Sequence, residues 1–386
     1  MLELFIINNK GMVIKKNFFQ TKINRVNLYS TKWTKYKKNI LPLWVADMDY
    51  QTVPEITLEL LEMFKHGSFG YTNPPPDMKK VISSYLNTVM HTKVKENNLF
   101  FLPNLGVGLN ALVRSLSKSD DSVLTFSPSY YPFFDCVKNS KRKLLISKLI
   151  RDEKKFFFDF ADIEKKLNKN TKIILLCNPH NPTGRLWTYD ELMTIEKIAK
   201  KNNLVIVSDE IHCEILMSDS AKFTSFHTIS KWARDNTVTL HSASKTYNLA
   251  ALGFAFGFAH NAKLKNKILD ETKGLFEYMS PYGFHATKIA FTRGENWKKH
   301  LLIHLQNNLK TLNKAFKKQN LFNYFIPEST YLLWLNCSKI KNPENYFLKK
   351  GLGLYNGSLF GSKSFMRLNF ACTQNDIKEI IKRLKL

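Results

Sequence analysis

Short apolar runs alternate with helix-like periods through the middle of the chain. Six runs rich in β-branched and aromatic residues predict strands, namely Ser122–Phe126, Leu144–Leu149, Lys172–Cys177, Leu204–Ser208, Thr237–His241 and Phe254–Phe258. Between them, apolar residues recur every three or four positions, which predicts helices. Strands and helices that alternate in this way predict an α/β fold with a mostly parallel sheet covered by helices.

Two of the predicted helices have recognisable ends. Thr188 and Glu191 have the spacing of a capping box, which predicts a helix that runs to about Lys201. A second helix is predicted over Pro54–Lys65, with Gly67 just past its end. The local signals therefore predict where these elements begin and end as well as their type.

The C-terminal part of the chain has a different pattern. A long helical stretch from about Trp297 to Lys318 precedes short strands near Tyr331–Leu335 and Phe365–Phe370 and a terminal helix. We interpret this part as a second, smaller α+β domain. We expect a large domain over residues 54–282 and a small domain formed by residues 1–53 and 283–386.

Composition narrows the class of protein. The chain has 386 residues, of which 44% are hydrophobic and 23% charged, as in globular proteins rather than disordered ones. No apolar run approaches the ~20 residues of a membrane-spanning helix, and Met1–Ile7 lacks the basic region and cleavage site of a signal peptide. The five cysteines include no C-x-x-C pair, which argues against a disulfide framework or a zinc site. We expect a reducing compartment, the cytoplasm.

The net charge of +26 raises the question of a nucleic-acid or membrane partner. Of the 58 basic residues 49 are lysine, and they are spread along the chain, most densely over Lys138–Lys143. Proteins that bind nucleic acid usually concentrate charge on one face and use arginine for base contacts. We interpret the lysines as solvated surface residues and expect neither a nucleic-acid nor a membrane partner.

Polar side chains follow three of the predicted strands. Asn181 comes after the strand that ends at Cys177, Asp209 after Leu204–Ser208, and Ser242, Ser244 and Lys245 after Thr237–His241. Ligands of parallel sheets bind beyond these carboxyl ends. A lysine amine can form a Schiff base with an aldehyde, and an aspartate can keep a pyridine nitrogen protonated. With an asparagine for a ring hydroxyl and serines for a phosphate, the set predicts a pyridoxal phosphate site.

Seven motifs along the chain carry a resemblance to a known family. They are Leu43-Trp-Val-Ala-Asp-Met-Asp49, Phe69-Gly-Tyr71 followed by three prolines, Ser127-Pro-Ser-Tyr-Tyr-Pro-Phe-Phe134, Cys177-Asn-Pro-His-Asn-Pro-Thr-Gly184, Ser208-Asp-Glu-Ile-His212, Ser244-Lys-Thr-Tyr-Asn248 and Phe365-Met-Arg-Leu-Asn-Phe-Ala371. In this order they resemble pyridoxal-phosphate enzymes of the aspartate aminotransferase fold (fold type I). Within that fold they resemble the MalY/PatB-type cystathionine β-lyases, class I/II aminotransferase relatives.

The resemblance implies a role for each matching residue. Lys245 would hold the cofactor and move the substrate Cα proton, and Asp209 would pair with the pyridine nitrogen. Arg367 and Ala46 would bind substrate, with Arg367 on the α-carboxylate. Tyr71 would reach the cofactor of a second subunit, which implies a homodimer with shared active sites. The resemblance implies no metal, and it implies further cofactor contacts for Asn181, Tyr130, His212, Ser242, Ser244, Leu105 and Gly106, the last two through backbone N–H groups.

Two positions favour a lyase over an aminotransferase. His212 and Gly253 stand where aminotransferases of this fold usually have tyrosine and arginine, and the lyases share both changes. The implied reaction is β-elimination, which would cleave L-cystathionine or related cysteine S-conjugates to a thiol, pyruvate and ammonia. The alternatives are an aminotransferase for an aromatic or sulfur amino acid and a non-catalytic basic binding or regulatory protein.

The chain departs from the family pattern at two places. Asn104 replaces a usual glycine at the phosphate-binding segment, with Gly106 appearing later, and the loop Leu354–Ser364 lacks the usual proline before Gly357. Because that loop borders the substrate in this fold, the sequence does not predict which thiol is the leaving group.

Overall fold

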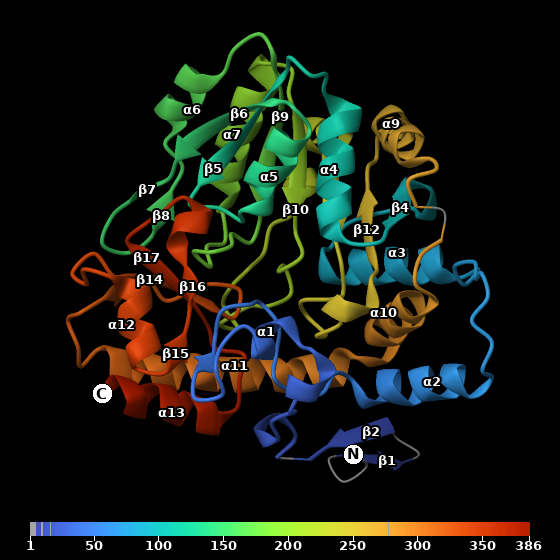
Figure 1. The fold of residues 1–386 in the computed structure, drawn as a ribbon. Coiled ribbons are helices and arrows are strands. Elements are labelled where there is room, and N and C mark those ends of the chain that lie inside the picture. The colour runs from blue at the N-terminus through green and yellow to red at the C-terminus, as the bar shows by residue number, and fades with distance from the viewer. Residues whose placement is uncertain (1–4, 9–10, 16, 277) are drawn as a thin grey trace.

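A seven-stranded sheet forms the centre of the larger part of the molecule (Figure 1). The structure is a computed structural model that describes residues 5–8, 11–15, 17–276 and 278–386. The strand order is β4-β12-β11-β10-β9-β5-β6, with bounds β4 Leu99–Leu102, β5 Ser122–Ser127, β6 Lys143–Lys148, β9 Thr171–Cys177, β10 Val205–Asp209, β11 Thr237–His241 and β12 Ala255–Phe258. Five neighbouring strands are parallel, and β12 pairs antiparallel with both β11 and β4. This confirms the predicted mostly parallel sheet.

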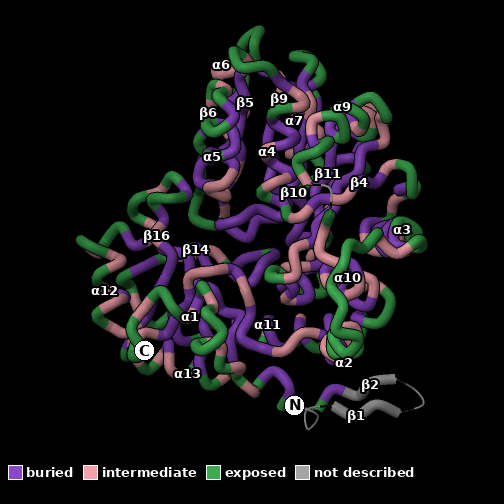
Figure 2. Tube along the Cα trace, turned by 45° about the vertical axis from the view of Figure 1, so that its right-hand side comes forward, coloured by how far each residue is buried: buried purple, intermediate pink, exposed green. Residues whose placement is uncertain are grey.

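Helices cover both faces of this sheet, because its strands carry apolar residues in both directions. In β9, Ile173 and Leu175 pack toward one set of helices, whereas Ile174 and Leu176 pack toward the other. The first set is α4 (Leu105–Leu116), α5 (Pro132–Asn139) and α9 (Ala262–Thr272), and the second is α6 (Phe160–Lys166), α7 (Tyr189–Lys201) and α8 (Lys231–Asn236). Buried residues accordingly run along β5, β9 and β10 in Figure 2.

The smaller part is built on a four-stranded antiparallel sheet, β13-β14-β17-β16. Its bounds are β13 Asn323–Tyr324, β14 Leu332–Asn336, β16 Tyr355–Asn356 and β17 Phe365–Asn369, with α11 Glu295–Phe316, α12 Pro343–Lys349 and α13 Gln374–Leu384 around it. The N-terminal segment joins this part, since β3 (Leu41–Pro42) pairs with β15 (Leu352–Gly353). Strands β14 and β17, the long helix α11 and the terminal helix confirm the α+β pattern that the sequence predicts.

Three further helices lie on the right-hand side of Figure 1, below β4 and β12: α2 (Pro54–Lys65), α3 (Met78–Val89) and α10 (Pro281–Arg293). Helix α10 packs against both of the others and contributes Phe284 to one apolar cluster and Ile289 to another. The boundary predicted at 282/283 falls inside α10, and the division into two domains stays a prediction.

Element ends agree closely with the sequence signals. Helix α2 has the predicted bounds, and α7 begins with the predicted capping box between Thr188 and Glu191. Strand β4 was missed, because a four-residue apolar run does not distinguish a strand from a helix. Of the N-terminal stretch examined for a signal peptide, residues 1–4 lie outside the described residues, and 5–8 form β1 (Phe5–Asn8), which pairs with β2 (Gly11–Ile14).

Two findings bear on composition. No helix of the described residues has the length and apolar character needed to cross a membrane. All five cysteines are buried and unpaired.

Candidate active site

The carboxyl ends of β9, β10 and β11 lie side by side, and the side chains that follow them surround a pocket of about 210 Å³. Asp209 ends β10, whereas Asn181 and Lys245 lie four residues beyond the ends of β9 and β11. The N-terminal segment and the smaller part close the pocket with Trp44, Val45, Ala46, Tyr355 and Arg367. The pocket therefore lies where the strand ends of the large sheet meet the smaller part.

Lys245 presents its amine to this pocket. Its Nζ donates a hydrogen bond of 2.7 Å to the carbonyl of Ala46, which also accepts from the Tyr331 hydroxyl at 3.1 Å. Burial lowers the pKa of Lys245 to about 8, against the opposing charge of Asp47. A sizeable fraction of the amine is therefore neutral near pH 8 and able to act as a nucleophile or a base.

Asp209 is a buried carboxylate with little to balance its charge. Its side chain accepts one backbone hydrogen bond, from Ile211 N at 3.2 Å, and the residue is 3% exposed. Burial raises the pKa of Asp209 to about 7, although the Lys245 charge opposes this. A protonated ring nitrogen would supply the missing donor and the missing charge, so this residue fits a pyridine cofactor.

Arg367 lies mid-strand in β17 with its guanidinium inside the pocket. Its Nη1 donates to Asn181 Oδ1 at 3.0 Å and its Nη2 to the Trp44 carbonyl at 2.9 Å, whereas Nε has no partner among the described residues. Both acceptors are neutral, and burial lowers the pKa of Arg367 to about 10. Because a buried cation is costly without an anion, this guanidinium fits a carboxylate ligand.

The start of α4 lies at the other end of the pocket, where Leu105 is a lining residue. The Asn104 side chain caps the helix by accepting from Val107 N at 2.9 Å. The N–H groups of Leu105 and Gly106 belong to the first turn, which has no carbonyl partner within the helix and suits a phosphate. A Cβ at Gly106 would lie 3.2 Å from Asn104 Oδ1, so the glycine at 106 leaves room for the asparagine at 104.

The predicted serines lie beside the pocket rather than on its lining. Ser242 Oγ donates to the Phe254 carbonyl at 2.8 Å and accepts from Ser244 N at 3.1 Å. The hydroxyl hydrogen of Ser242 is therefore engaged within its own loop. Phosphate contacts by Ser242 and Ser244 stay predictions.

The remaining predicted residues differ in position. Tyr130 and His212 line the pocket, and burial raises the pKa of Tyr130 and lowers that of His212, so that both side chains are neutral. The His212 Nδ1 atom is buried with no hydrogen-bond partner in the part of the chain that the structure describes. Tyr71, by contrast, is 85% exposed and stacks on Tyr278, outside the pocket.

Sequence reasoning missed several lining residues, including Thr31, Tyr131 and Tyr355. Trp44 lines the pocket and stacks on Tyr355, with ring centroids 5.2 Å apart. No local signal marks these positions, because only tertiary contacts bring them to the strand ends.

A buried ion-pair network holds the segment that contains Trp44 and Ala46. Lys32 is 1% exposed, and its Nζ lies 2.9 Å from Asp49 Oδ2 and 3.4 Å from Asp47 Oδ1. Arg25 pairs with both carboxylates at 3.0 Å. No sequence signal around Lys32 predicts that it is buried.

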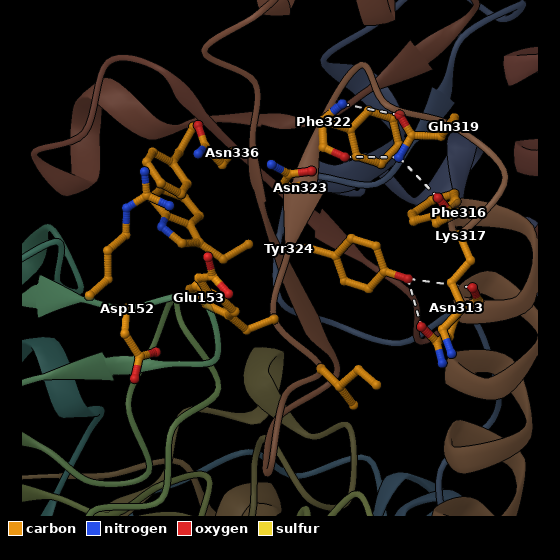
Figure 3. Close-up of a pocket in the computed structure, with 15 residues that line it drawn as sticks. Asp152, Glu153, Asn313, Phe316, Lys317, Gln319, Phe322, Asn323, Tyr324 and Asn336 are labelled. Atoms are coloured by element: carbon orange, nitrogen blue, oxygen red, sulfur yellow. Dashed lines mark hydrogen bonds between the residues drawn. The ribbon is translucent and has the colours of Figure 1, made fainter.

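Two other places in the fold, a larger cavity and a cluster of buried polar side chains, are weaker candidates for an active site. A larger cavity of about 890 Å³ lies beside the end of α11, where the Tyr324 hydroxyl donates to Asn313 and the Gln319 amide donates to the Phe322 carbonyl (Figure 3). Its lining is mainly aromatic and amide side chains, and it contains neither Lys245 nor Asp209. Cys213, Glu214 and His241 lie within metal-binding distance of one another, but Lys298 already pairs with Glu214 at 3.0 Å.

Comparisons with known proteins agree with the fold. The family model described as aminotransferase class I and II matches residues 38–384. The cystathionine β-lyase PatB of Bacillus subtilis is 29% identical over 383 residues, which cover 95% of this chain and 98% of the relative. The pyridoxal-phosphate-containing structure of cystalysin from Treponema denticola has a TM-score of 0.90 at 28% identity, covering 95% and 97% of the two chains. The pyridoxal-phosphate-bound C-S lyase from Staphylococcus hominis has a TM-score of 0.88 at 27% identity, with the same coverage.

The match to the family model spans most of the chain and includes every residue of the pocket except Thr31. The central sheet, the strand-end lysine and aspartate, and the helix start beside them are the features that the sequence motifs predicted. The chain therefore belongs to the class I and II aminotransferase family.

Proposed function

We propose that this protein is a pyridoxal-phosphate-dependent carbon–sulfur β-lyase that cleaves L-cystathionine or related cysteine S-conjugates to a thiol, pyruvate and ammonia. One observation carries the proposal: a single pocket is lined by Lys245, Asp209 and Arg367. The Lys245 amine has a lowered pKa, and the Asp209 carboxylate and the Arg367 guanidinium are both buried. The names of PatB and of the Staphylococcus hominis lyase support the same reaction class.

When bound, pyridoxal phosphate supplies an aldehyde for an amine and a protonated pyridine ring that withdraws electrons from the substrate Cα. Asp209 would accept a hydrogen bond from the pyridine nitrogen, which balances its buried charge. Asn181 would bind the ring hydroxyl and Tyr130 would lie against the ring. The N–H groups of Leu105 and Gly106 would bind the phosphate at the start of α4.

Lys245 would act as the base. Its amine, whose pKa burial lowers to about 8, would take the proton from the substrate Cα, while the Ala46 carbonyl orients Nζ. Arg367 would bind the α-carboxylate through its planar fork. The substrate thiolate then leaves from Cβ, and water converts the released enamine to pyruvate and ammonia.

Two residues support elimination over transamination. His212 is neutral and buried at a position where aminotransferases of this fold usually have tyrosine. Gly253, which has a φ of +66°, stands where they usually have an arginine. The retained Lys245, Asp209 and Arg367 weigh against a non-catalytic binding protein.

We also propose a cytoplasmic homodimer. Phe69, two residues before Tyr71, lies against Phe64 near the end of α2, and all three rings are exposed, which suits a surface that a second copy covers. Tyr71 would then reach the cofactor phosphate of the partner. Five buried, unpaired thiols suit a reducing compartment. Light scattering of the purified protein tests the dimer, and a mass near 44.9 kDa would contradict it.

The function is tested on protein loaded with pyridoxal phosphate and mixed with L-cystathionine without a keto acid. Thiol and pyruvate are measured in parallel, and equal amounts of the two are expected. The Lys245→Ala variant, prepared in the same way, is the control and should release neither. Thiol release without pyruvate, or activity that requires a keto acid, would contradict the proposal.

A further inference from the structure

Two cations contact the aromatic wall of the pocket. Trp44 and Tyr355 form this wall, with nearly parallel rings (20°). Arg367 Cζ lies 5.0 Å from the Tyr355 ring centroid, and Lys35 Nζ lies 5.3 Å from that centroid and 4.0 Å from the Trp44 ring. The sum of the two Tyr355 distances, about 10 Å, is the upper limit of the separation between the charges.

Lys35 owes its position to helix α1 (Thr31–Thr34), which it caps. Thr31 lines the pocket, and residues four apart lie on the same helical face, so Lys35 stands at the mouth of the pocket. The residue is exposed, unlike Arg367. One cation therefore lies inside the pocket and the other at its entrance.

The contacts of the Lys35 ammonium are aromatic faces rather than a carboxylate. Glu344 acts on it electrostatically, but the described hydrogen bond of that carboxylate comes from Asn356 Nδ2 at 2.8 Å. Partial burial lowers the pKa of Lys35, and the Glu344 charge opposes this. A partly desolvated ammonium of this kind gains from an anionic ligand.

We propose that Lys35 binds a second carboxylate of the substrate, beyond the sulfur atom, while Arg367 binds the first. The inference rests on the proposed lyase function and narrows its substrate class to cysteine S-conjugates with a distal carboxylate. Seven bonds join the carboxyl carbons of a thioether such as L-cystathionine. Three backbone bonds span at most about 3.6 Å, so seven bonds span about 8 Å. An ion-pair contact adds about 3 Å at each end, so the molecule would bind in a bent rather than an extended conformation, which brings both carboxylates within reach of cations that are at most about 10 Å apart.

Flexible lysine is suited to this task, because its compact charge on a four-carbon stem can follow a mobile end group. The pair would be partly exposed to solvent, so its contribution is modest and falls as salt rises. We expect a change of about fivefold in KM, the size typical of an exposed ion pair. The elimination step itself should not change, because Lys35 lies outside the set of groups that bind the cofactor.

The test compares two substrates on the loaded enzyme, L-cystathionine and S-ethyl-L-cysteine, which has no distal carboxylate. In Lys35→Gln, KM for L-cystathionine should rise about fivefold with kcat unchanged, and both constants for S-ethyl-L-cysteine should stay within about twofold of wild type. Lys35→Arg keeps the charge and should restore most of the preference. The matched control is Lys37→Gln, which removes an exposed lysine two residues away; among the described residues the lysine contacts with the aromatic wall are those of Lys35.

The outcomes are distinct. Equal losses for both substrates, or no loss for either, in Lys35→Gln would overturn the inference while leaving the lyase proposal intact. The same loss in Lys37→Gln as in Lys35→Gln would also overturn it, since net charge would then be the cause. A wild-type enzyme that releases no pyruvate from either substrate would overturn both proposals together.

Discussion

Replacing Asp209 by asparagine should have opposite effects on two properties at pH 8. The cofactor-free protein should become more stable, and its affinity for pyridoxal phosphate should fall. The carboxylate is buried with a single backbone donor, and burial raises its pKa from an ordinary 3.8 to about 7. A shift of one pKa unit corresponds to about 1.36 kcal/mol, so three units amount to about 4 kcal/mol. The ionised Asp209 side chain should therefore destabilise the cofactor-free protein by up to about 4 kcal/mol above pH 7.

The direction of the pH dependence follows from proton binding. Between pH 3.8 and about 7 the folded protein holds the Asp209 proton while the unfolded chain has lost it. The free energy of unfolding therefore falls as the pH rises through this range and levels off above it. Glu210, whose pKa burial raises to about 7 with a smaller contribution from the Asp209 charge, adds a similar slope, most of which the variant keeps.

The amide that Asp209→Asn introduces cannot ionise, so this part of the slope is absent in the variant. The hydrogen bond described at this side chain comes from a donor, so the NH₂ group of the buried amide is left without an acceptor, which costs about 1–3 kcal/mol. We expect the variant to be about 2 kcal/mol more stable than wild type at pH 8 and less stable at pH 5. Its affinity for pyridoxal phosphate should nevertheless fall by about tenfold or more, because the ring nitrogen loses its anionic partner.

Urea unfolding of both proteins without cofactor, at pH 5 and pH 8, measures the first effect. Absorbance titration with pyridoxal phosphate measures the second. A variant that is less stable than wild type at both pH values, or that keeps the wild-type pH slope, would refute this account of Asp209.

Three further substitutions test other parts of the site. In Lys245→Ala, borohydride reduction should no longer attach the cofactor covalently, so protein mass spectrometry should show the unmodified chain; a reduced adduct would contradict the assignment. Arg367→Lys should raise KM for L-cystathionine about 10- to 100-fold in the pyruvate assay, because one charge-assisted hydrogen bond of the fork is lost, and an unchanged KM would remove Arg367 from substrate binding. Lys32→Met should lower the free energy of unfolding in urea by about 3 kcal/mol, because it leaves buried Asp49 without its closest cation, whereas exposed Lys37→Met should change it by less than about 0.5 kcal/mol. Equal effects of these two lysine substitutions would mean that the buried network contributes little.

How much of the site the sequence could predict depended on where each residue lies relative to the sheet. Asp209 ends one recognisable strand and Lys245 lies four residues beyond another, and parallel strands bring their carboxyl ends to one edge, so the proximity of the two residues could be predicted. Tyr355 begins the two-residue strand β16 and Thr31 begins the four-residue helix α1, and elements this short have no recognisable pattern in the sequence. Their place in the pocket depends on the pairing of β3 with β15 and on the packing of the smaller part.

Burial was the other limit of prediction. Lysine is almost never fully buried unless it is paired, and nothing around Lys32 in the sequence marks it as an exception. Only the fold brings Asp47 and Asp49 to it. Conversely, the sequence shows that Asn104 departs from the family pattern but not what the residue does, whereas in the structure it caps α4 and Gly106 leaves room for its side chain.

The most direct test of the proposed lyase function is the number of turnovers per active site without a keto acid. Loaded enzyme is mixed with about a thousandfold excess of L-cystathionine, and pyruvate is followed through lactate dehydrogenase while the absorbance of the bound cofactor is recorded. The account predicts hundreds of pyruvate molecules per site with the cofactor spectrum regained at the end. A single conversion of the cofactor to its amine form, reversed only by adding a keto acid, would contradict it and identify an aminotransferase.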